Sequence, residues 1–193
     1  ICAHGVHLTE KDMSLLAKTK TSVIYNPESN MKLGAGTTSI GRLLSAGIAV
    51  GIGTDGAASN NNLNLFHEMD TGAKLQKVSE HNNTAMTAEQ ALVMATLGGA
   101  KALGLESKIG SIEVGKFADL IAVDFTHPHM QPIHNFASQL VYSATGLEVT
   151  WVMCHGKTLF ADGKHQTLDL QNIYQQANGY KQQILYVQKN TCI

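Results

Sequence analysis

An acidic side chain in a glycine-flanked turn is the first candidate for chemistry in this sequence. Asp55 follows the apolar run 48–52 and lies between Gly53 and Gly56, where little backbone bulk surrounds its carboxylate. Such a carboxylate can bind a divalent metal, accept a proton, or do both. An Asx-type turn at the end of a strand explains the same residue without chemistry, and position alone does not separate the two interpretations.

Polar residues also follow the two preceding apolar runs. His4 lies near the end of the run 1–6, and Asn26 ends the run 22–25 and opens a polar turn that includes Ser29 and Asn30. A single histidine in such a place is more often structural than a ligand or proton carrier, and a polar turn most often caps its own backbone. If these side chains lie together at the carboxyl-terminal rim of a barrel, they could instead orient a substrate or hold the loop that orients it.

Two motifs are predicted to carry no site. The glycines of 51–56 match the bare GxGxxG pattern, but Asp55 lies inside the loop that would hold a pyrophosphate and would repel it. His127-Pro128-His129 resembles the HxH pair of zinc enzymes, but proline occupies its middle position and the segment follows a strand of a small β module. We predict a surface loop there.

Three continuous apolar runs alternate with helical patterns over residues 1–56. Thr9 and Asp12 form an approximate capping box for the first helix, and Gly47 suits the end of the second. This β-α-β-α-β order with unbroken apolar strands is typical of a parallel sheet covered on both faces. In an α/β barrel the carboxyl ends of successive strands surround one site, so the polar residues at these ends are expected to converge.

The rest of the chain changes character near residue 109. Helices are expected around 65–73 and after the capping box of Thr87 and Gln90, and the small residues 98–100 suggest a helix break with a close backbone approach. From 109 on, the turn region 110–116 and the strands 118–123, 149–154 and 158–160 predict a small β module. A final helix is predicted from an apolar stripe at helical spacing: Ile173, Ala177, Tyr180, Ile184 and Val187.

Composition excludes several classes of partner. The 193 residues carry 14 basic and 15 acidic side chains and no basic run, so neither nucleic acid nor an anionic membrane is an expected partner. No apolar stretch approaches the ~20 residues of a membrane span. Cys2, Cys154 and Cys192 are scattered, which fits a reducing cytoplasm rather than a disulfide framework. The chain starts with Ile1 and no methionine, so we expect a piece of a longer polypeptide.

Several segments together resemble one family. Residues 4–8, 26–34 and 53–61 look like the later strands of amidohydrolase-superfamily deaminases, in the subgroup of 5-methylthioadenosine/S-adenosylhomocysteine deaminases and chlorohydrolases. Residues 110–116 followed by 118–124 are similar to the return of that superfamily into its composite β-sandwich. The resemblance spans roughly residues 1–170.

The resemblance implies an α/β fold, with the C-terminal part of a TIM (β/α)8 barrel. Residues 1–108 would form strands six to eight of a metal-dependent hydrolase barrel, and residues 109–193 part of the composite β-sandwich and a C-terminal helix.

The resemblance also implies a site and a reaction. Asp55 would end strand eight as a metal ligand and as the base that takes a proton from the attacking water. His4 would end strand six and contact that water or the substrate, while Asn26, Ser29 and Ser59 would line or brace the pocket. The implied reaction is hydrolytic deamination of a small-molecule purine nucleoside of the adenine type. It would use one divalent metal, zinc or else iron or another metal, in a full-length protein expected to be a homo-oligomer.

The family's other metal-site residues have no counterparts in this sequence. The His-x-His pair of strand one, the histidine of strand five and the glutamate that follows it are missing, and a TIM barrel takes ~250 residues. We therefore expect the chain alone to be inactive and to bind zinc weakly. The alternatives are a chlorohydrolase or guanine deaminase of the same superfamily, and a non-catalytic half-barrel interaction module.

Overall fold

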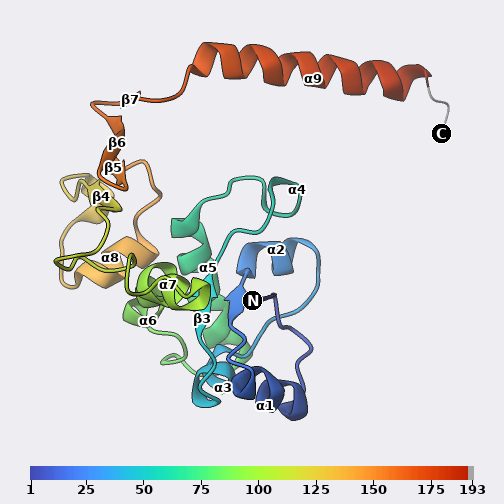
Figure 1. The fold of residues 1–193 in the computed structure, drawn as a ribbon, viewed down its shortest axis with the longest axis vertical. Helices are drawn as coiled ribbons and strands as arrows, with labels where there is room; N and C mark the ends of the chain where they lie inside the picture. The colour runs from blue at the N-terminus through green and yellow to red at the C-terminus, as the bar shows by residue number, and fades with distance from the viewer. Residues whose placement is uncertain (191–193) are drawn as a thin grey trace.

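The structure is a computed structural model that describes residues 1–190, arranged as two sheets with flanking helices and one projecting helix (Figure 1). The N-terminal elements are β1 (Cys2–Ala3), α1 (Glu10–Lys18), β2 (Val23–Tyr25), α2 (Pro27–Lys32), α3 (Ile40–Ser45), β3 (Val50–Ile52), α4 (Ala57–Asn60), α5 (Leu65–Ser79), α6 (Ala88–Val93), the π-helical turn η1 (Met94–Gly98) and α7 (Gly99–Leu103). The C-terminal elements are β4 (Leu120–Val123), the 3-10 helix η2 (Pro128–Met130), α8 (Phe136–Tyr142), β5 (Val149–Cys154), β6 (Lys157–Ala161), β7 (Lys164–His165) and α9 (Leu170–Asn190).

The first sheet is parallel, in the order β1-β2-β3. Its strands alternate with helices as the sequence predicts, and the capping box of Thr9 and Asp12 is present at the start of α1. The central strand is buried, with Val23 and Tyr25 fully inaccessible to solvent. The α/β class is thereby confirmed, and the carboxyl ends of the three strands lie at one edge of the sheet.

Three glycines bring a helix against β3. A Cβ atom on Gly98 would lie 2.7 Å from the carbonyl oxygen of Val50, and one on Gly51 would lie 3.0 Å from the Cα of Gly99. The predicted close approach is therefore confirmed. The predicted helix break is wrong, because α6 continues through the π-helical turn η1 into α7. A π turn of this kind holds one extra residue without interrupting the helix.

The second sheet is antiparallel, in the order β4-β5-β6-β7, and contains the three strands predicted for the β module. Residues 110–116 form turns and loop, in line with the prediction. After β4 the chain returns to the first unit, since α8 packs against α5 and α6 and buries Val141 in the main core. The boundary at residues 108/109 stays a prediction.

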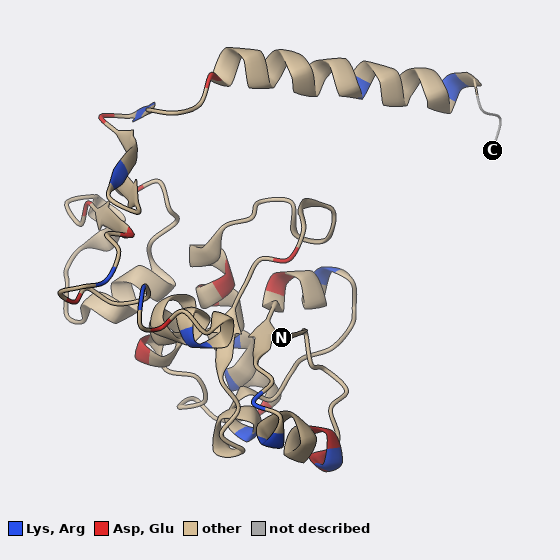
Figure 2. Ribbon diagram, viewed as in Figure 1, with Lys and Arg blue, Asp and Glu red and all other residues tan. Residues whose placement is uncertain are grey.

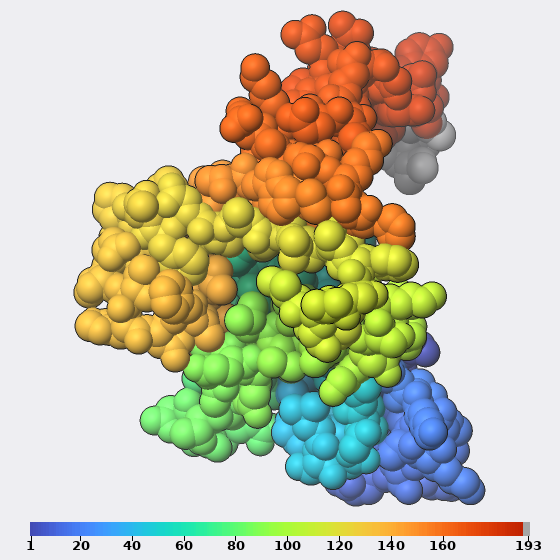
Figure 3. Space-filling model, turned by 60° about the vertical axis from the view of Figure 1, so that its left-hand side comes forward, coloured from blue at the N-terminus to red at the C-terminus, as the bar shows by residue number. Residues whose placement is uncertain are grey.

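The predicted C-terminal helix is present as α9, which extends away from the body of the molecule (Figures 1 and 3). None of its residues is buried, and Figure 2 shows that it carries few charges. No helix within residues 1–190 is long and apolar enough to cross a membrane. Cys192 lies outside the described residues.

Candidate active site

His4 follows β1 directly, Asp55 lies three residues after the end of β3, and the two share an unusual backbone conformation. Their φ angles are 65° and 61°, in the left-handed region. For a residue with a side chain this conformation costs roughly 1–2 kcal/mol. The backbone N–H of His4 donates to Ile24 O at 2.9 Å, which fixes the end of β1 against β2. Strain of this kind, here after two strands whose carboxyl ends lie at one edge of the sheet, is common at functional sites.

Two serine hydroxyls hold the carboxylate of Asp55. Ser29 Oγ on α2 and Ser59 Oγ on α4 each donate to Asp55 Oδ2 at 2.7 Å. Hydrogen bonds from Ser29, Ser59 and the Gly56 backbone, in that order, lower the pKa of Asp55 to about 2. The group is therefore ionised at neutral pH and can only accept hydrogen bonds or bind a cation.

The imidazole of His4 is oriented by Asn30. His4 Nδ1 lies 2.8 Å from Asn30 Oδ1, and because an amide oxygen accepts, Nδ1 carries the proton. In the neutral ring Nε2 is then unprotonated, and it lies 3.9 Å from Asp55 Oδ2. That separation is too long for a hydrogen bond, so the two groups face a shared space. The His4 side chain is 40% exposed and that of Asp55 is 33% exposed.

Two buried asparagines line the same edge. Asn26 Nδ2 donates to Gly53 O at 2.9 Å and so ties the end of β2 to the end of β3. Asn26 Oδ1 and Asn30 Nδ2 are buried and have no hydrogen-bond partner within residues 1–190. Buried polar atoms are nearly always paired, so these two need a partner that residues 1–190 do not supply.

The structure brings all five predicted site residues to this edge: His4, Asn26, Ser29, Asp55 and Ser59. Their roles stay predictions.

The segment around His127 and His129 lies elsewhere and is more ordered than the predicted surface loop. It contains η2, and His129 Nε2 lies 2.7 Å from Oε1 of Glu148, which is 1% exposed. Burial alone would raise the pKa of Glu148, but hydrogen bonds from backbone N–H groups, His129 and Thr145 lower it to about 2.

Sequence reasoning missed a carboxylate behind the site. Glu68 on α5 is 0% exposed, and its two oxygens accept hydrogen bonds from Glu28 N at 3.1 Å and from Asn60 Nδ2. Burial, which outweighs these hydrogen bonds, raises the pKa of Glu68 to about 7. The available signal was an acidic residue three positions after Leu65 and next to Met69, on the apolar side of the predicted helix.

The residues present supply only part of a metal site. No cluster of three His, Cys, Asp or Glu side chains that could hold a metal exists in the described part of the chain. Catalytic zinc typically has about three protein ligands and a water. Asp55 has the right donor type, and the described residues place no second ligand of that kind beside it except His4, which is assigned to the water or the substrate.

A histidine and an ionised carboxylate at the carboxyl ends of parallel strands place this chain among α/β proteins with a polar centre at that edge. The chain belongs to the amidohydrolase family, whose family model matches residues 1–159.

It is 49% identical over 176 residues to a 5-methylthioadenosine/S-adenosylhomocysteine deaminase of Moorella thermoacetica, covering 91% of this chain and 41% of the relative. The chain thus spans about two fifths of the length of the curated relatives it matches.

Two solved structures are similar to the chain. An adenosine deaminase from Xanthomonas campestris with bound zinc superposes with a TM-score of 0.92 at 41% identity, covering 96% of this chain and 42% of that one. An atrazine chlorohydrolase from Arthrobacter aurescens complexed with zinc gives a TM-score of 0.85 at 26% identity, covering 92% and 39%.

Proposed function

We propose that this chain is the C-terminal portion of a metal-dependent amidohydrolase that hydrolytically deaminates an adenine-type nucleoside such as 5-methylthioadenosine or S-adenosylhomocysteine. In this assignment β1, β2 and β3 are barrel strands six, seven and eight. The observation that carries the proposal is the Asp55 carboxylate, which two serines hold in the ionised state facing His4 across 3.9 Å. The identity to deaminases of the same name supports the substrate class.

The residues of this chain would move one proton and orient the reactants. Deamination adds water to the ring carbon that bears the amine and releases ammonia. The Asp55 carboxylate accepts one proton of the attacking water and passes it to the departing nitrogen, while the other proton of the water ends on the adjacent ring nitrogen of the product. His4 Nε2, with its lone pair in the shared space, accepts a hydrogen bond from the water or the substrate amine. Asn26 ties the ends of two strands together, and Ser29 and Ser59 hold the same oxygen of the Asp55 carboxylate.

The acidity of Asp55 fits a metal-dependent reaction. A carboxylate with a pKa of about 2 is a weak base toward ordinary water, whose pKa is far higher. A bound divalent metal would supply the missing activation, because it lowers the pKa of water to about 7. Asp55 would be one ligand of that metal, and we propose zinc because related structures bind it.

Two other functions stay open as alternatives. A chlorohydrolase or guanine deaminase would use the same Asp55 and His4, and the similarity to an atrazine chlorohydrolase favours testing that reaction. A half-barrel interaction module would keep the fold without catalysis. It would leave the strained backbone of Asp55 and the two serine contacts without a chemical role.

The deciding experiment is a substrate panel on the full-length protein loaded with zinc. We expect ammonia release from 5-methylthioadenosine or S-adenosylhomocysteine, with little release from guanine and no chloride from a chlorotriazine. Chloride release or a guanine preference would favour the other hydrolases, and no turnover of any substrate would overturn the hydrolase assignment. Residues 1–193 alone are expected to be inactive, and tight stoichiometric zinc in them by elemental analysis would contradict the partial-site interpretation.

A further inference from the structure

A buried carboxylate joins the two short helices that hold Asp55. Glu68 lies on α5, outside the site itself, and none of its surface reaches solvent. Its Oε2 accepts the backbone N–H of Glu28, the residue before Ser29. Its Oε1 accepts Asn60 Nδ2, and Asn60 is the residue after Ser59. The Glu68 carboxylate therefore accepts one hydrogen bond from each of the two helices that carry Ser29 and Ser59.

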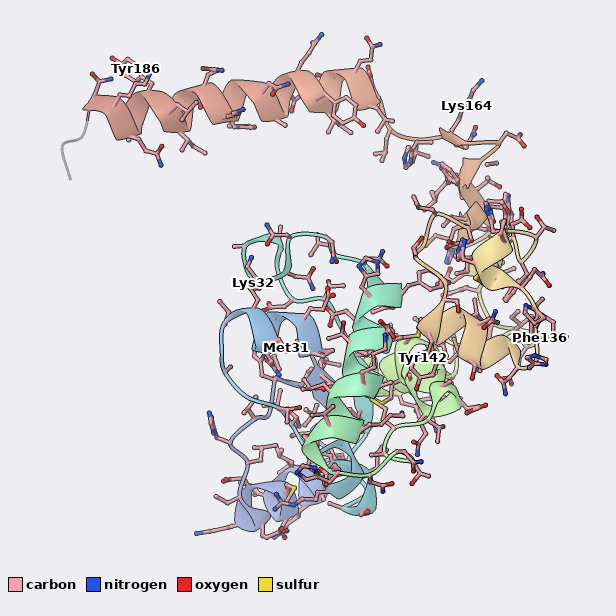
Figure 4. The ribbon with its side chains drawn as sticks, turned by 180° about the vertical axis from the view of Figure 1, so that it is seen from behind. Met31, Lys32, Phe136, Tyr142, Lys164 and Tyr186 are labelled. Atoms are coloured by element: carbon pink, nitrogen blue, oxygen red, sulfur yellow. The ribbon has the colours of Figure 1, made fainter. Side chains whose placement is uncertain are left out.

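Other hydrogen bonds also join these helices, among them one of 3.3 Å from Asn60 Nδ2 to Glu28 Oε2. α2 has six residues and α4 has four, and isolated helices of this length are unstable in water. The carboxylate of Glu28 accepts Asn62 Nδ2 at 3.1 Å, and Lys32 reaches from α2 to Ala58 O at 2.9 Å (Figure 4). Both of these links are exposed to solvent and are therefore weak. Glu68 is a fully buried link between the two helices, since its side chain is inaccessible to solvent and accepts a hydrogen bond from each of them.

We propose that Glu68 is a positioning residue for the site: by fixing α2 and α4 together, it holds Ser29 and Ser59 at hydrogen-bond distance from Asp55 Oδ2. Its kinetic consequence rests on the proposed function, while its structural consequence does not. The described hydrogen bonds of Glu68 do not include Asp55, so Glu68 acts through two intermediates, Glu28 N–H with Ser29 and Asn60 with Ser59. A change at Glu68 is therefore expected to displace the serine on whichever helix loses its hydrogen bond to the carboxylate.

The first test is Glu68→Gln in the full-length protein. Glutamine keeps the size of the side chain but has one acceptor oxygen instead of two, so one of the two helices loses its partner. A misplacement of about 1 Å costs up to roughly 10²-fold in rate, so kcat should fall by about 10- to 100-fold with KM nearly unchanged. Gln76→Leu is the matched control, because Gln76 is also buried on α5 but bonds Tyr25 and Thr38 instead. It should lower stability and leave kcat unchanged.

A second comparison separates positioning from general loss of structure. In the background Ser29→Ala/Ser59→Ala, Glu68 has no serine contacts left to position. The effect of Glu68→Gln on kcat should therefore disappear in that background. An equally large additional loss there would overturn the proposal, as would a loss of kcat in Gln76→Leu equal to that in Glu68→Gln.

The third test does not depend on which reaction the protein catalyses. In a crystal structure of Glu68→Gln, at least one serine Oγ should lie beyond hydrogen-bond distance of Asp55 Oδ2, while the parent keeps both contacts. Two retained contacts would overturn the positioning role even if the parent is an active deaminase. Absence of deaminase activity in the parent would refute the proposed function only. If Glu68→Gln does not fold, Asn60→Ala decides: it removes the hydrogen bonds of Asn60 to Glu68, Glu28 and the Leu63 backbone while the bond from Glu28 N–H to Glu68 remains, so it should displace Ser59 but not Ser29.

Discussion

The free energy of unfolding should fall as pH rises through the range in which Glu68 titrates. The pKa of Glu68 is about 7 in the folded protein against an ordinary value of 4.5, mainly because the group is buried. Between these two values the folded state binds the proton more tightly than the unfolded state does, so raising the pH favours unfolding. At ~1.36 kcal/mol for each unit of pKa, the loss amounts to about 3 kcal/mol and is complete near neutral pH.

The assay is equilibrium urea unfolding followed by circular dichroism from about pH 4 to about pH 8, on the parent and on Glu68→Gln. The glutamine removes the titration, so the difference between the two proteins should change by about 3 kcal/mol in favour of the variant as pH rises. A difference between parent and Glu68→Gln that does not vary with pH would refute the reasoning.

Three further predictions follow from the same geometry. Ser29→Ala/Ser59→Ala removes the two largest causes of the low pKa of Asp55, so a carbon-13 NMR titration of that carboxyl should show a pKa near its ordinary 3.8 instead of about 2; an unchanged value would contradict the serine contacts. Gly98→Ala places a Cβ atom 2.7 Å from a carbonyl oxygen and should destabilise the protein by about 1–3 kcal/mol in urea unfolding. Gly41→Ala on α3, where the Cβ atom meets open space, is the control and should stabilise the protein by ~0.5–1 kcal/mol. Equal effects of the two substitutions would contradict the close packing of η1 on β3. Glu148 has a pKa of about 2 in the folded protein against an ordinary 4.5. Its contribution to the free energy of unfolding is therefore present above pH 4.5 and is lost as the pH falls toward 2. Acid unfolding of Glu148→Gln should lack this dependence on pH.

Local chemistry made much of the fold predictable from the sequence. The capping boxes at Thr9 and Thr87 are present, because a cap depends on residues three positions apart. The parallel order of β1, β2 and β3 follows from continuous apolar runs separated by helices. That order in turn placed His4 and Asp55 at the same edge, although they are far apart in the sequence.

The features that the sequence did not predict depend on contacts between distant residues. Glu68 bonds the backbone of a residue 40 positions earlier, and no local pattern specifies that pairing. The same holds for His129, whose partner Glu148 is 19 positions later. The π-helical turn at Met94–Gly98 lies where the helix contacts the backbone of β3. The small residues there predicted the close approach, but they did not predict that the helix continues through a π turn.

The central claim is that Asp55 is the proton acceptor of a hydrolytic deaminase, and Asp55→Asn tests it most directly. The amide keeps the shape of the side chain and cannot take the proton. A general base contributes roughly 10²- to 10⁴-fold, so ammonia release from 5-methylthioadenosine by the zinc-loaded full-length variant should fall at least 10²-fold below the parent. Ammonia release at the parent's rate would contradict the account.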